Sequence, residues 1–396
     1  MTEIVYGSVI SEKREPIVLH WWHTVDRVSL AFVLGLFGIG VLLGLAASPP
    51  LAAKNGYAPL HYVNRHLIFG SIAIVVMFIC SMVSPKMLRR LGVIGFILSF
   101  IALALLPVFG TDFGKGSIRW YSLGFSSLQP SEFVKPFFVI ITAWLISVSF
   151  EINGPPGKAI SFIIAILVSL FLVAQPDFGQ ASLILASWGM IYFVAGAPLI
   201  LLLVVAIAIV LSGTFAYSFS EHFARRIDGF LSVKIDPNTQ IGYATNAIQE
   251  GGIFGVGVGE GLVKNVLPDA HTDFIIAVAA EEYGLLFVLL IIFVYLTIIA
   301  RSLFRLIKER NTFIRLAGTG LAVLFASQAL INLGVAVRLL PAKGMTLPFI
   351  SYGGSSLLAG GIAVGMLLAF TRERPQGTIG DVIGANHHDG LKYEQN

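Results

Sequence analysis

The sequence is poor in cysteine and in charge. Its single cysteine, Cys80, excludes an intramolecular disulfide and leaves no set of thiolates for a zinc site. It contains no Walker loop and no recognisable Ser-His-Asp arrangement, and nothing in it predicts a metal site or a nucleic-acid partner. Only 12% of its 396 residues are charged and 56% are hydrophobic, which excludes an ordinary soluble domain. Repeated apolar runs of about twenty residues predict an all-α polytopic membrane protein.

Ten transmembrane helices are predicted, near residues 27–48, 67–84, 92–109, 132–150, 158–175, 178–196, 198–217, 274–300, 313–337 and 347–370. The first twenty residues mix acids and bases with apolar residues, so no cleavable signal peptide is expected. The predicted organisation is an N-terminal segment, a transmembrane domain and a tail, at residues 1–24, 25–372 and 373–396. A large loop is predicted between the seventh and eighth spans, at residues 218–270.

Basic residues gather in two short predicted loops, one with Lys86, Arg89 and Arg90, the other with Arg301, Arg305, Lys308 and Arg310. Short loops rich in lysine and arginine face the cytoplasm. With ten spans, both termini are then cytoplasmic and the large loop is extracytoplasmic.

The large loop ends in the stretch Leu267-Pro268-Asp269-Ala270-His271-Thr272-Asp273-Phe274. Connections of about fifty residues are far above the usual length and tend to be functional or disordered. Asp273 stands where this loop meets an apolar span, and a carboxylate at a membrane boundary favours a functional role. The alternative is that Asp273 caps the helix that follows.

Three other groups of polar residues favour a binding role, each with a structural alternative. Glu132 and Lys135 share a helix face, so they form either an inward functional pair or a helix-dipole acid with its partner. Arg119 and Trp120 suit an anionic sugar-linked ligand, or lie in a solvated loop. Arg338, Lys343 and the glycine- and serine-rich segment from Ser351 bind an anion or serve packing. The glycines at 251–261 have no nucleotide-binding context and predict an extended, closely packed re-entrant piece.

Five ordered motifs together resemble the SEDS family (shape, elongation, division, sporulation): Arg119-Trp120, Gln129-Pro130-Ser131-Glu132 with Lys135, Gln175-Pro176-Asp177-Phe178-Gly179, Leu267 to Phe274 with Glu281-Glu282, and Leu347 to Ser356. The similarity covers about residues 25–372. Residues 341–348 are more similar to the division branch of the family than to the rod-elongation branch. Gln180 is a departure, since the family often has Thr after Gly179.

The resemblance implies a membrane glycosyltransferase that polymerises lipid II, the undecaprenyl-diphosphate-linked precursor, into peptidoglycan strands. The transfer is inverting and releases undecaprenyl diphosphate. No cofactor is required by the sequence, and assistance by a divalent cation is left open. The implied partners are a class B penicillin-binding protein with transpeptidase activity and other divisome proteins. The implied location is the bacterial cytoplasmic (inner) membrane, at the division septum.

Within this resemblance Asp273 is the expected general base. Arg119, Lys135, Arg338 and Lys343 are the expected cations for the diphosphate, because two phosphates need charge that a bilayer surface does not supply. Glu132 is expected to position Lys135 or a loop cation. The predicted substrate-binding set is completed by Trp120, Lys264, His271 and Ser351.

Three other functions are weighed against this one. A lipid II flippase would need a polar path through the bundle, for which Glu132, Lys135, Glu281 and Glu282 are candidates. An ion-coupled secondary transporter would show broken helices at mid-membrane and an inverted repeat, and no such repeat is seen. The rod-elongation polymerase of the same family is the nearest alternative.

Overall fold

The computed structural model describes residues 16–112, 118–124, 126–198, 239–341 and 344–374, with scattered positions between 200 and 230. Its described α-helices are α1 (Ile17–Thr24), α2 (Arg27–Lys54), α3 (His61–Met82), α4 (Pro85–Phe109), α5 (Pro130–Val148), α6 (Gly157–Ala174), α7 (Phe178–Val194), α10 (Gln240–Gly251), α11 (Ile275–Ile307), α12 (Thr312–Ala336) and α13 (Gly354–Phe370). A short 3-10 helix η1 (Val263–Asn265) and a two-stranded antiparallel hairpin, β1 (Tyr121–Ser122) and β2 (Ser127–Leu128), complete them.

The predicted all-α, multi-span architecture is confirmed. Seven of the described helices are long and apolar enough to cross a membrane, and α7 and α13 are shorter apolar helices. Together these nine helices match nine of the ten predicted spans in order. The span predicted at 198–217 falls largely on positions outside the described residues, as do most of residues 1–24, 218–238 and 375–396.

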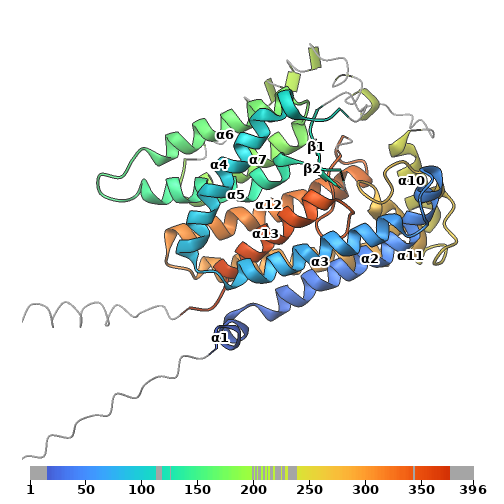
Figure 1. Ribbon diagram of the computed structural model, residues 1–396, viewed down its shortest axis with the longest axis horizontal. Helices are drawn as coiled ribbons and strands as arrows, with labels where there is room; N and C mark the ends of the chain where they lie inside the picture. Colours follow the sequence, from blue (N-terminus) through green and yellow to red (C-terminus); the bar gives the residue numbers. More distant parts are fainter. Residues whose placement is uncertain are drawn as a thin grey trace, which may run out of the picture.

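The long helices lie side by side, and chain segments gather at the two ends of the bundle (Figure 1). We call one the α10 end: it contains α10, the hairpin, and the residues that precede α5, α7, α11 and α13. The α1 end contains α1 and the residues that follow α11 and α13. Because successive helices run in opposite directions, residues at the start of α11 and residues at its far end belong to different faces of the protein.

Close backbone approach joins α3 to α13. A Cβ atom added at Gly361 would lie 2.4 Å from the carbonyl oxygen of Ala73, and one at Gly365 would lie 2.6 Å from that of Met77. Glycines four residues apart therefore let α13 pack on α3 at backbone distance, as small residues do in membrane helices.

Ion pairs hold the α1 end together. Asp26 caps α2 by accepting the N–H groups of Val28 and Ser29, and it pairs with Arg301 (2.8 Å) and Arg305 (3.4 Å) at the end of α11. Burial raises the pKa of Asp26, but hydrogen bonds from Arg301 and Ser29 and the charge of Arg305 outweigh that effect. The net pKa of Asp26 lies below its ordinary value.

Helix α11 is broken at Gly284, whose φ of 78° is left-handed and suits glycine. The carbonyl oxygens of Glu281 and Glu282 accept hydrogen bonds from Val256 (2.9 Å) and Gly257 (3.2 Å) in the preceding loop. In return, the N–H groups that follow the break, at Leu285 and Leu286, donate to carbonyls at residues 252 and 253. The backbone groups freed by the break are thus satisfied by another segment, as a membrane protein requires.

The segment that fills this break, residues 251–264, is named the loop clamp. A Cβ added at Gly251 would lie 1.9 Å from the carbonyl oxygen of Ala280, and one at Gly255 would lie 2.1 Å from that of Glu282. The close packing predicted for the glycines at 251–261 is confirmed at Gly251 and Gly255, where glycine is required, whereas a Cβ added at Gly252 or Gly259 would meet nothing within 4 Å.

The last described helix starts later than predicted. The tenth span was predicted at 347–370, whereas α13 begins at Gly354. Residues 347–351 instead form a turn in which the Leu347 N–H donates to the Ser351 hydroxyl (2.9 Å) and Phe349 has a φ of 65°. The turn removes these residues from the helix despite their apolar character.

Candidate functional site

Asp273 lies at the α10 end, in the turn that leads into α11. The turn begins at Asp269, whose φ is 53°, and the Asp273 N–H donates to the Asp269 carbonyl (3.1 Å). Phe274, not Asp273, occupies the capping position of α11. The structure therefore gives no support to helix capping as the reason for this half-buried carboxylate.

The backbone on both sides of Asp273 is fixed by donors from other parts of the chain. Three successive carbonyl oxygens accept hydrogen bonds: that of His271 from the Tyr352 N–H (3.0 Å), that of Thr272 from the Ser351 hydroxyl, and that of Asp273 from the Asn332 amide (2.9 Å). Two of these donors precede α13 and the third lies on α12. The main chain under the carboxylate is held by three separate bonds.

The segment before α13 also passes next to the carboxylate itself. A Cβ added at Gly344 would lie 3.1 Å from Oδ2 of Asp273. Lys343, the predicted cation that precedes Gly344, lies outside the described residues. Ser351 is buried and bonds both Leu347 and Thr272, so in this structure it fixes the turn.

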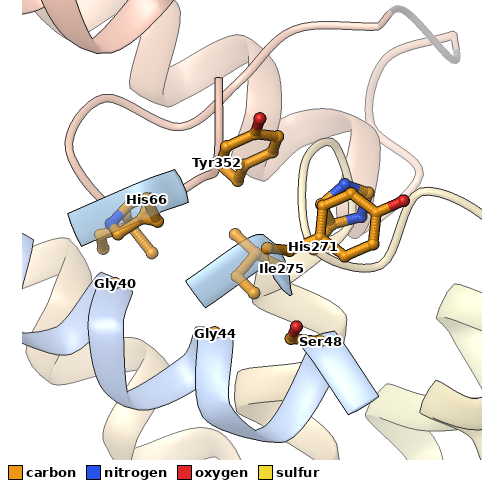
Figure 2. A pocket seen from close by; sticks show the side chains of 9 residues that line it. Gly40, Gly44, Ser48, His66, His271, Ile275 and Tyr352 are labelled. Carbon is orange, nitrogen blue, oxygen red and sulfur yellow. The ribbon is translucent and has the colours of Figure 1, made fainter. Parts of the chain in front are cut away.

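His271 is packed among aromatic rings. Its ring centroid lies 4.7 Å from that of Tyr62 and 5.6 Å from that of Tyr352, and its side chain is buried. These rings border a small cavity against α2, which is also lined by Gly40, Gly44, Ser48, His66, Ile275 and Ile350 (Figure 2). The predicted binding residue His271 thus faces this cavity region from the same turn that carries Asp273.

A second polar cluster lies where α5 and α7 begin. Nζ of Lys135 is 2.8 Å from Glu132, and both side chains are buried. The amide of Gln180 donates to the other oxygen of Glu132. The predicted shared face is confirmed as a buried ion pair, and Gln180, noted only as a departure from the family pattern, is part of it.

Arg119 supports the turn next to this cluster. It donates to the carbonyls of Gln175 (3.0 Å) and Pro176 (2.7 Å), while Asp177 accepts the Gln180 N–H (3.4 Å) and caps α7. Burial raises the pKa of the Asp177 carboxyl, and the negative charge of Glu132 adds to the effect; the charge of Arg119 acts in the opposite direction. Residues 175–177 therefore form a turn between α6 and α7, with a buried acid inside it.

Main-chain pairing places Trp120, whereas Arg338 is held through its side chain. Trp120 pairs with Thr111 across an isolated β-bridge, which closes the base of the hairpin. Arg338 follows α12 with a φ of 59°, and its Nη2 donates to the carbonyl of Phe230 (3.1 Å). Both belong to the α10 end.

Lys264 is committed to the loop clamp. Its ammonium pairs with Glu282, which also accepts the Gly259 N–H (3.1 Å). Glu281 accepts the N–H groups of Val263 (2.7 Å) and Lys264 (3.0 Å). Both acids therefore bond to the loop clamp, and among the contacts of the described residues neither meets Glu132 or Lys135, the other candidates for a polar path.

The two polar clusters are joined through the first residues of α13. The Ser355 hydroxyl bonds the backbone of Ser127 and Gln129 just before α5. The next residue, Ser356, bonds Thr346 in the segment beside Asp273. Asp273, His271 and Ser351 on one side, and Arg119, Glu132 and Lys135 on the other, are thus brought to one end of the protein.

Sequence reasoning missed Asn332. It is an amide within the apolar helix α12, 2% exposed, and it contacts the Asp273 main chain. Its signal was present, because a buried amide in a membrane helix needs a partner, but the partner could not be named from the sequence.

The fold and this arrangement define a multi-span membrane protein with a polar site at one end of the bundle. The model of the cell cycle protein family FTSW_RODA_SPOVE matches residues 27–376. A protein of Caulobacter vibrioides named "Probable peptidoglycan glycosyltransferase FtsW" is 39% identical over 357 residues, which are 90% of this chain and 91% of that protein. A protein of the same name from Trichlorobacter lovleyi is 35% identical and covers 87% and 92%. The chain belongs to this family, as its five motifs predicted.

Solved structures agree. A chain of a structure described as "Structural coordination of polymerization and crosslinking by a peptidoglycan synthase complex" has a TM-score of 0.72 and 27% identity, covering 89% of this chain and 99% of that one. The rod shape determining protein RodA of Thermus thermophilus has a TM-score of 0.66 and 25% identity, covering 90% and 99%. The relatives named FtsW agree with the division branch predicted from residues 341–348.

Proposed function

We propose that the protein is a peptidoglycan glycosyltransferase that polymerises lipid II into glycan strands during septal cell-wall synthesis, with Asp273 as its general base. The observation that carries the proposal is the placement of Asp273: a carboxylate at the α10 end, not used as a cap, on a main chain fixed by three hydrogen bonds. The names of its relatives supply the reaction class.

The chemistry matches this geometry. An acceptor hydroxyl is a poor nucleophile, and a carboxylate within hydrogen-bond reach can take its proton as it attacks the anomeric carbon of the donor. The bond to the lipid diphosphate breaks with inversion, and the departing diphosphate needs cations, not a proton. A rigid support for the base keeps the reacting atoms in line.

The four proposed cations have different roles. Lys343 immediately precedes the segment beside Asp273 and Arg338 follows α12, so these two are proposed to meet the diphosphate. Lys135 forms a buried ion pair with Glu132, and Arg119 donates hydrogen bonds to the 175–177 turn. These two cations are therefore proposed to stabilise the structure around the diphosphate site. Trp120, His271 and Ser351 lie at the same end of the protein and complete the proposed substrate-binding set. No cofactor is assigned, and whether a divalent cation assists is left to experiment.

The proposed orientation follows the distribution of basic residues. The basic residues predicted in two short loops lie mostly in helix ends: Lys86, Arg89 and Arg90 are in the first turns of α4, and Arg301 and Arg305 are in the last turns of α11. Both groups belong to the α1 end, which is therefore assigned to the cytoplasm together with both termini. The α10 end then faces the outside of the inner membrane, where lipid II enters from the bilayer. The proposed partner is a class B penicillin-binding protein of the divisome, consistent with the synthase complex among the similar structures.

The test is polymerisation of lipid II by purified protein in detergent, with and without the partner. Asp273→Asn should lower glycan synthesis by roughly 10²-fold or more, because the amide cannot take the proton. Asp269→Asn is the matched control: it changes a carboxylate in the same turn, and asparagine tolerates the left-handed φ. Near-native synthesis by folded Asp273→Asn would refute the assignment.

The same protein in vesicles tests the flippase alternative. A flippase moves labelled lipid II across the bilayer and makes no glycan, whereas the proposed enzyme makes glycan whether or not the lipid crosses. Restoration of septation, and not of rod elongation, in depleted cells distinguishes the division branch from the elongation branch.

A further inference from the structure

Asn332 is a buried polar residue that the reaction scheme above does not use. It lies in the last turns of α12, between Ile331 and Leu333, and is 2% exposed. Burying an amide in such surroundings costs free energy unless its hydrogen-bonding groups find partners. The amide nitrogen of Asn332 has two partners, whereas its oxygen Oδ1 has none among the described residues, so the nitrogen's bonds are what keep the residue in place.

The side-chain nitrogen of Asn332 joins two segments of chain. It donates to the carbonyl oxygen of Asp273 (2.9 Å) and to that of Met345 (2.6 Å). Both acceptors are carbonyls, which can only accept, so the NH₂ group must face them and uses both of its hydrogens. The orientation of the amide is fixed by this chemistry.

The Asp273 carbonyl needs this donor because α11 does not supply one. The N–H of Ala277, which would reach back four residues to Asp273 in a regular helix, instead donates to Phe274 (2.9 Å). The helix starts after Asp273, so its carbonyl is left to the side chain from α12.

The second bond fixes what faces the carboxylate. Met345 follows Gly344, the residue at which an added Cβ would lie 3.1 Å from Oδ2 of Asp273. One amide thus holds the main chain that carries the carboxylate and, through the next residue, the segment that passes over it.

Resting on the function proposed above, we propose that Asn332 is a positioning residue that sets the place of the Asp273 carboxylate relative to the 344–347 segment. It touches no reacting atom and acts through Asp273. A displacement of about 1 Å at a catalytic group can lower a rate by about 10²-fold. Losing Asn332 therefore lowers turnover and leaves lipid II binding nearly intact.

The test uses Asn332→Leu, which keeps the branching and the number of heavy atoms of the side chain and suits an apolar helix but donates no hydrogen bond. In the polymerisation assay kcat should fall roughly 10- to 100-fold while KM changes less than about threefold. Thr319→Val, a buried polar residue on the same helix near its other end, is the matched control and should retain wild-type kinetics. Thermal unfolding in detergent checks that both variants are folded.

A double variant separates positioning from general stability. If Asn332 acts through Asp273, Asn332→Leu adds little to the loss caused by Asp273→Asn; two independent losses would multiply. Multiplying losses, or a wild-type kcat in folded Asn332→Leu, would overturn the proposal while leaving the general base in place. Should Asn332→Leu fail to fold, Asn332→Ser, with one donor left, must show the same kcat loss without a KM change, and its absence overturns the proposal. A wild-type protein that makes no glycan would overturn the proposed function itself, and the positioning role with it.

Discussion

Replacing Lys264 by methionine should destabilise the protein without weakening its affinity for lipid II. Lys264 pairs with Glu282, and the two side chains are 6% and 0% exposed. Methionine keeps the length of the side chain but leaves the carboxylate buried with the Gly259 N–H as a remaining donor. Removing one partner of a buried pair costs about 3–5 kcal/mol, because the other charge stays out of water. A loss of that size is a large share of the stability of a typical domain.

The assay is thermal unfolding of purified protein in detergent, followed by lipid II binding below the unfolding temperature. Lys86→Met, at an exposed lysine of the α1 end, is the matched control and should change stability by less than about 0.5 kcal/mol. The double variant Lys264→Met/Glu282→Gln should recover part of the loss, since the uncompensated charge is gone. A stable Lys264→Met protein with weakened lipid II binding would refute this reasoning and restore Lys264 to the substrate-binding set predicted from the sequence.

Three further predictions concern acids and glycines away from Asp273. Asp26→Asn should lower the unfolding temperature at neutral pH. The difference from wild type should vanish as the pH falls through the lowered pKa of Asp26, because the stabilisation needs the ionised acid. A difference that persists in acid would contradict the ion pairs as its source. Asp177→Asn should keep the α7 cap, and its stability at neutral pH should equal or exceed that of wild type. The reason is the raised pKa of Asp177: ionising this buried acid costs stability as the pH rises above the ordinary carboxyl pKa. Clear destabilisation at neutral pH would show that the charge is needed. Gly255→Ala should impair folding far more than Gly259→Ala, although both glycines have a left-handed φ. Only a Cβ at residue 255 would meet a backbone oxygen, at 2.1 Å. Equal yields of folded protein would refute the close contact.

The spans were readable from the sequence because each is an apolar run of membrane length. The exceptions have physical causes. Residues 347–353 are apolar enough to extend the last helix, but the turn closed by Ser351 and the left-handed Phe349 stop it from doing so. The break at Gly284 escaped notice because hydrophobic periodicity does not show which helix hydrogen bonds another segment replaces.

Some contacts of the site could likewise be predicted from the sequence, and others could not. The pairing of Glu132 with Lys135 follows from a spacing of three residues on one helix, and it was predicted. Lys264 was assigned to substrate because it is basic and precedes Asp273, yet its partner, Glu282, lies beyond Asp273 in the chain. Contacts between distant segments, such as that of Asn332 with Asp273, depend on how helices pack and leave no local pattern.

The broken helix also has a consequence for how the protein is made. Residues 251–264 leave the ribosome before residues 281–286, so the groups that complete α11 are already synthesised when the break emerges. Until those groups dock, unpaired amides and carbonyls at the break carry a cost in a lipid environment. We therefore expect α11 to reach its final form only after residues 251–264 have folded back and bonded to its backbone at the break.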